Sequence, residues 1–154
     1  MHRYALSKHH EKFILSKASR KVIIGPVAGG RTFACLAASA RHGRVGYLGK
    51  SVASDLEAEA ERYGMPVEID YSGGFPVLLA DDGISFNWEG IEERTVIAAC
   101  NYSQAGCYLT NKMFEIHYLP PVGKGAPENH LPDGYYKQLL MLRPDLSFDI
   151  ELYR

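Results

Sequence analysis

The feature that most limits the fold of this chain is a glycine-rich segment between an apolar run and a helical pattern. Its sequence, GPVAGGRT over residues 25–32, has the spacing G-x-x-x-x-G-K-[ST] of a phosphate-binding loop, with arginine in place of the lysine. The run Val22-Ile23-Ile24 before it is typical of a short buried strand, and Phe33 to Ala38 after it is typical of a helix. Strand, loop and helix in this order predict an α/β fold with a mainly parallel sheet.

The residue types of this segment suit phosphate chemistry. Glycines allow consecutive N–H groups to point at phosphate oxygens, and the following helix adds the positive end of its dipole. The candidate nucleotide-binding residues are Gly25, Gly29, Gly30, Arg31 and Thr32, and the Thr32 hydroxyl is also a candidate Mg²⁺ ligand. Since arginine is a planar, bulkier fork than lysine, Arg31 is compatible with phosphate binding but unfavourable for hydrolysis. The alternative is a glycine-rich turn that holds no ligand.

Composition fits one intracellular domain over residues 1–154. Seventeen basic and eighteen acidic residues give a net charge of −1, which does not indicate a nucleic-acid surface. The three cysteines have neither C-x-x-C nor zinc-finger spacing, so we expect reduced thiols and no zinc, and we expect no haem or flavin. No apolar run approaches the roughly 18 residues of a membrane span, and the first residues do not resemble a signal peptide. We therefore expect a soluble protein without a membrane partner.

Two more strands and a second helix are predicted after the loop. Arg44–Gly49 and Thr95–Cys100 are apolar enough to be buried strands. Asn101 follows the second of these, and strand ends of this kind carry ligand-sensing residues in open α/β sheets. Helical periodicity runs from Val52 to Tyr63, with Ser54 and Glu57 as an expected capping box and Gly64 as the stop.

The segment from Val77 to Trp88 has two interpretations. Asp82-Gly83 between apolar runs is a strong hairpin signal, and we favour it because it also explains the alternating residues that follow. In the alternative, Val77–Ala80 is a Walker B strand and Asp81 and Asp82 hold Mg²⁺ and water. These two aspartates are the only catalytic candidates, and they are weak ones.

The ends of the chain are less informative. Residues 8–21 are rich in lysine and histidine, which suits either a phosphate-contacting arm or, more commonly, a solvated helix face. The segment from 119 to 127 is too rich in proline and glycine for a regular element. A short helix is expected over 131–142 and a last strand over 148–152.

Several stretches, taken in order, resemble one family. FILSKASRKVIIGPVAGGRTFACL, residues 13–36, is similar to the start of the ATPase domain of tailed-bacteriophage large terminase subunits, where a strand leads into GPxGSGKT. PENHLPDGYYKQLL and FDIELY, at 127–140 and 148–153, look like the end of that domain, which has the form ENLPxGYYxxLL. TVIAACNYS, at 95–103, is similar to the strand with the family's coupling motif and would put Asn101 at the sensor position.

The resemblance implies a fold, cofactors and partners, and the departures from it matter too. It implies a P-loop NTPase-like three-layer fold with a shortened middle and a β-hairpin, ATP and Mg²⁺ as ligands, and a place in the host cytoplasm or the virion. Implied partners are packaging or virion proteins, such as a terminase or portal, or further copies of the chain, with DNA inferred from the resemblance alone. Ala28-Gly29-Gly30 stands where the family has Gly-Ser-Gly, and no apolar strand ending in Asp-Glu occurs between Trp88 and Thr95. The chain has no room for the family's nuclease domain.

Three hypotheses for function follow. The leading one is a terminase-like nucleotide-binding protein with impaired catalysis, which acts in phage DNA packaging by binding or regulation. The second is an active minimal NTPase in which Arg31 contacts the γ-phosphate and Asp81 or Asp82 holds the metal. The third is a virion or interaction protein with an empty loop.

Overall fold

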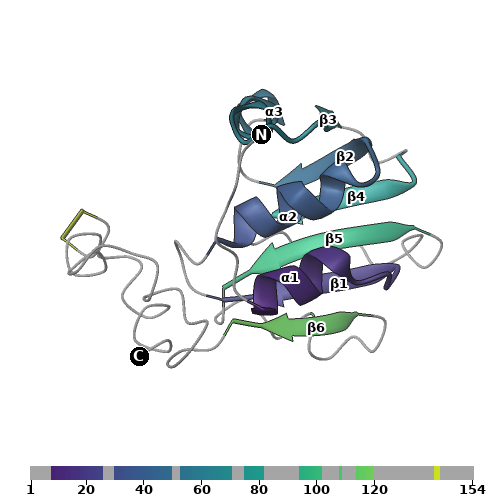
Figure 1. The fold of residues 1–154 in the computed structure, drawn as a ribbon, viewed down its shortest axis with the longest axis vertical. Coiled ribbons are helices and arrows are strands. Elements are labelled where there is room, and N and C mark those ends of the chain that lie inside the picture. The colour runs from purple at the N-terminus through teal and green to yellow at the C-terminus, as the bar shows by residue number, and fades with distance from the viewer. Residues whose placement is uncertain are drawn as a thin grey trace.

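A computed structural model describes residues 8–25, 30–49, 53–70, 75–81, 94–101, 108, 114–119 and 141–142. Three helices and six strands form the described part of the chain (Figure 1). They are α1 (Lys8–Leu15), β1 (Arg20–Ile24), α2 (Arg31–Ala40), β2 (Arg44–Gly49), α3 (Ala53–Arg62), β3 (Glu68–Asp70), β4 (Val77–Asp81), β5 (Thr95–Cys100) and β6 (Glu115–Tyr118).

The strands form one sheet in the order β3-β2-β4-β5-β1-β6, and each neighbouring pair is parallel. This confirms the expected α/β fold with a mainly parallel sheet. Parallel sheets are stable when both faces are covered, and β1 has no exposed residue. None of the described helices combines the length and apolar character that crossing a bilayer requires.

The two faces of the sheet are buried in different ways. The three helices cover one face, where Phe13 of α1, Leu36 of α2 and Leu56 of α3 share one cluster with Ile23 and Ile97 of the sheet. Figure 1 shows α1 and α2 side by side across β5, β1 and β4. The opposite face of the sheet carries a second buried hydrophobic cluster. Its members are Val22, Ile24, Leu78, Ala80, Val96, Ala98 and Cys100, together with Tyr108 and Phe114.

Local signals placed several elements correctly. β2 and β5 have the predicted bounds, and α2 extends the expected helix by two residues at each end. Gly64 ends α3 as predicted: its φ is 72°, and the bonds from Met65 N to Ala60 O and from Gly64 N to Glu61 O, both 2.9 Å, form a Schellman motif.

The prediction of a capping box at the start of α3 is wrong. Ser54 is the second residue of α3 and so cannot be its N-cap. Glu57 serves a different purpose, because its Oε2 accepts a hydrogen bond of 2.9 Å from the backbone N–H of Ile69. The carboxylate thereby ties α3 to the short edge strand β3.

The pairing of β4 shows that the hairpin interpretation is wrong. Asp81 is paired with Gly49 of β2 on one side and with Ala99 of β5 on the other, both in parallel. No edge of β4 is left for the antiparallel partner that Asp82-Gly83 predicts. Asp82 and the expected strand from 84 to 88 lie outside the described residues, as do residues 148–152 and all but 141–142 of the expected helix at 131–142.

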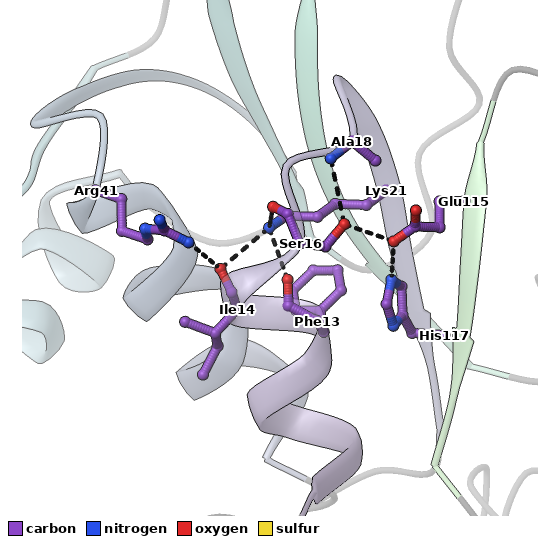
Figure 2. Close-up of polar contacts among 8 residues, drawn as sticks. All are labelled: Phe13, Ile14, Ser16, Ala18, Lys21, Arg41, Glu115 and His117. Atoms are coloured by element: carbon purple, nitrogen blue, oxygen red, sulfur yellow. Dashed lines mark hydrogen bonds and ion pairs between the residues drawn. The ribbon is translucent and has the colours of Figure 1, made fainter.

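Two cations attach the C-terminal end of α1 to the sheet (Figure 2). Lys21 Nζ donates hydrogen bonds to the backbone oxygens of Phe13, Ser16 and Ile14 at 2.6, 2.9 and 3.3 Å. Arg41 Nη1 donates to the Ile14 oxygen at 2.9 Å. Carbonyls in the last turn of a helix have no intrahelical partner, so these side chains act as a C-terminal cap.

Candidate functional site

The chain leaves two neighbouring strands in opposite directions at the carboxyl edge of the sheet. β1 is followed by α2 on the helix-covered face, whereas the chain after β5 reaches Tyr108, which packs on the other face. Open α/β sheets bind ligands in the crevice that such a divergence creates. Gly25 and Asn101, two of the predicted site residues, are the first residues beyond these strands, and Gly25 N donates a bond of 3.2 Å to Cys100 O.

Gly30 is the N-cap of α2 and adopts a left-handed conformation. Its φ is 79° and its ψ is 17°, a conformation that glycine adopts without the steric penalty of other residues. A Cβ at this position would lie 3.0 Å from Nε2 of His10 on α1. Gly30 supplies no capping side chain to the first turn of α2, so the positive end of this helix faces the loop as phosphate binding requires.

We expect Gly30→Ala to lower the free energy of unfolding by about 1–2 kcal/mol, because alanine in this conformation is strained and its methyl group crowds His10. Urea denaturation followed by circular dichroism measures the change. An unchanged free energy of unfolding would show that the cap does not need a left-handed residue.

Gly25 is required by packing rather than by a ligand. A Cβ there would lie 2.6 Å from Cδ1 and 3.0 Å from Cγ of Leu119. Leu119 follows β6, is fully buried, and donates its N–H to Ile24 O at 2.9 Å. The first glycine of the motif therefore lets the ends of β1 and β6 approach each other.

Arg31 and Thr32 form the first turn of α2. Arg31 is only 6% exposed, and its Nη1 is fully covered from solvent. A guanidinium removed from water needs compensating polar or anionic groups. The Arg31 side chain is thus enclosed by the protein at the start of α2. Thr32 is half-buried, and its hydroxyl stands one residue after the cation, as the motif requires.

Asp81 and Asn101 complete the same edge of the sheet. Asp81 ends β4 level with Ala99, and Asn101, 8% exposed with its Oδ1 covered, follows β5. Because β4, β5 and β1 are adjacent, the backbones of Asp81, Asn101 and Gly25 stand at the ends of three neighbouring strands. The structure thus brings together Gly25, Gly30, Arg31, Thr32, Asp81 and Asn101 at one edge, while Gly29 and Asp82 lie outside the described residues.

His10 is the residue at this site that sequence reasoning missed. It is 6% exposed and lies against Gly30 from α1, yet its neighbours in sequence are polar, with His9 half-buried and Glu11 exposed. Only its position three residues before the buried Phe13 suggests an inward-facing side chain.

The donor set suits a hard cation held partly by a ligand. Among the described residues, no group of three or more His, Cys, Asp or Glu side chains could hold a metal ion. Mg²⁺ bound with a nucleotide needs only one or two protein oxygens, because phosphates and water supply the rest. The Thr32 hydroxyl is an oxygen donor of the right kind.

No family model, curated protein or solved structure matches this chain. The resemblance to terminases therefore depends only on the sequence stretches at 13–36, 95–103, 127–140 and 148–153.

Proposed function

We propose that this chain is a nucleotide-binding domain of the P-loop type, related to the ATPase domain of phage large terminases, that acts by binding rather than by rapid turnover. The observation that carries the proposal is the left-handed Gly30 at the N-terminus of α2, at the edge of the sheet where the neighbouring strands β1 and β5 end. Bound nucleotide would regulate contacts with packaging or virion proteins, or with further copies of the chain.

In this proposal each residue of the site has its own role. The loop and the first turn of α2 bind the phosphates, and Arg31 contributes positive charge. Mg²⁺, when bound with the nucleotide, neutralises phosphate charge, and Thr32 and Asp81 are the residues that would hold it. In this proposal the Asn101 side chain senses the terminal phosphate.

Slow hydrolysis follows from Arg31. Phosphoryl transfer depends on positioned cations and an oriented water, and the loss of one such element typically reduces the rate by orders of magnitude. A nearly buried guanidinium, fixed by packing, cannot follow the γ-phosphate as a flexible lysine ammonium does.

The register of β4 favours a second candidate, an active minimal NTPase. Asp81 ends a central parallel strand with both edges paired, which is the setting that a Walker B carboxylate needs. In this candidate Asp81 holds the metal and Arg31 contacts the γ-phosphate.

Titration calorimetry with ATP and Mg²⁺, combined with a phosphate-release assay, tests both candidates. We expect Thr32→Ala to weaken binding of the Mg²⁺–ATP complex about tenfold, since one metal ligand is lost. Ser54→Ala is the matched control, because Ser54 is the second residue of α3 as Thr32 is of α2, and its affinity should equal that of the wild type.

The outcomes separate the hypotheses. Binding with turnover far below the roughly 1–100 per second of kinases supports the leading proposal. Fast turnover that Asp81→Asn abolishes would establish the active NTPase instead. Absence of any ATP binding would contradict both candidates and leave the interaction protein with an empty loop.

A further inference from the structure

A basic cavity lies at the amino edge of the sheet, on the side opposite the glycine loop. It has a volume of about 260 Å³ and is bordered by the start of β1, the start of β5 and the end of α2. Its lining includes four basic residues, Lys17, Lys21, Arg41 and His42, and the hydroxyl residues Ser19 and Thr95, and none of the described lining residues is a carboxylate.

Two of the four basic side chains are held in place by hydrogen bonds. Lys21 Nζ is fixed by three backbone oxygens at the end of α1, and Arg41 by one of them. Figure 2 shows both side chains converging on this helix end from β1 and from the end of α2. Their positions at the cavity wall are therefore set before any ligand arrives, which reduces the entropy lost on binding.

The other polar side chains retain donors for a ligand. Among the described residues, the side chains of Lys17, Ser19, His42 and Thr95 make no hydrogen bond to one another or to other groups. Glu115 contacts the lining residue Ser16, and its Oε1 accepts bonds from Ser16 Oγ at 2.5 Å and from His117 Nε2 at 2.6 Å. These bonds, that from Ser16 first, lower the pKa of the Glu115 carboxyl.

The cavity has a positive potential. Partial burial, then the charges of Lys21 and Arg41, lower the pKa of the His42 imidazole. An anion in the cavity would offset these charges and favour the protonated ring.

We propose that this cavity binds a phosphate-class oxyanion, either free phosphate or the terminal phosphate of a small molecule. Fixed cations and hydroxyl donors are the features that recognise such a dianion. The volume is below the roughly 300–1,000 Å³ of pockets for drug-sized ligands, which limits the occupant to a small molecule. The site is separate from the glycine loop and does not depend on nucleotide binding there.

Titration of the ¹⁵N-labelled protein with inorganic phosphate, at constant ionic strength, tests the proposal. We expect amide shifts at residues 16–19 and 41–42, and a rise in the His42 pKa as phosphate binds. The double variant Lys17→Gln with His42→Gln should weaken binding at least about tenfold. Lys12→Gln is the matched control, because Lys12 is exposed on α1 and does not line the cavity.

Three results would overturn the proposal. The first is the absence of shifts at these amides in about 10 mM phosphate, a concentration at which even a weak millimolar site is mostly filled. The second is an equal loss of affinity in the Lys12→Gln variant, which would indicate general electrostatics. The third is a response of the same amides to duplex DNA but not to phosphate, which would assign the surface to a nucleic-acid backbone.

Discussion

Replacement of Lys21 by methionine is expected to lower the free energy of unfolding by about 3 kcal/mol. Lys21 is only 4% exposed, and its ammonium group satisfies three backbone oxygens at the end of α1. Methionine keeps the aliphatic stem but donates no hydrogen bond, so the Phe13 and Ser16 oxygens would lose the bond from Lys21, whereas the Ile14 oxygen would keep its bond from Arg41. Burial, followed by the charge of Arg41, lowers the Lys21 pKa, so the environment disfavours the charged form and the three hydrogen bonds to carbonyl oxygens oppose this effect.

Urea denaturation measures this loss, with Lys17→Met as the matched control. Lys17 is exposed, and surface substitutions of this kind usually change stability by less than about 0.5 kcal/mol. Similar losses in the two variants would show that the contacts of Lys21 contribute little. Amide exchange adds a local test, since α1 should lose protection in Lys21→Met before the central strands do.

Gly25→Ala is expected to destabilise the protein by about 3 kcal/mol, at the upper end of the range for overpacking. The new methyl group would lie 2.6 Å from Leu119 Cδ1, and Leu119 Cβ, at 3.1 Å, does not move when the side chain changes rotamer. Relief therefore requires the backbones of β1 and β6 to separate, which strains their parallel pairing.

Gly43→Ala isolates the steric part of this effect. Gly43 has a φ of 78°, and nothing lies within 4 Å of a Cβ placed there, so alanine should cost only the conformational penalty of about 1 kcal/mol. Denaturation curves for the two variants give the comparison. A smaller loss for Gly25→Ala than for Gly43→Ala would mean that Leu119 does not pack against the start of the loop.

Local sequence signals predicted the elements better than their arrangement. The apolar runs at 44–49 and 95–100 and the stop at Gly64 depend on neighbouring residues, and all three are confirmed. The Asp81-Asp82-Gly83 signal is compatible with both a turn and a strand end, and the pairing of β4 with β2 and β5 decides between them. Such pairing joins residues far apart in sequence, which periodicity does not encode.

Only those residues of the candidate site that belong to a sequence motif could be predicted. Gly30, Arg31 and Thr32 occupy the start of α2 as the loop spacing implies, and Asn101 directly follows its strand as expected. His10 and Lys21 were not assignable, because their partners are a glycine twenty residues away and the carbonyls of a preceding helix. Charge in the segment from 8 to 21 indicated a solvated face, whereas burial of these two side chains follows from the docking of α1.

The position of β1 between β5 and β6 has a consequence for synthesis of the chain. β1 is the first strand made, but its two neighbours are the last two described strands. Ribosomes add about 5–20 residues per second, so Val22, Ile23 and Ile24 wait on the order of 5–20 seconds before Tyr118 is made and both edges can pair. During that interval a very apolar strand is unpaired, and nascent-chain chaperones are the factors expected to protect it from aggregation.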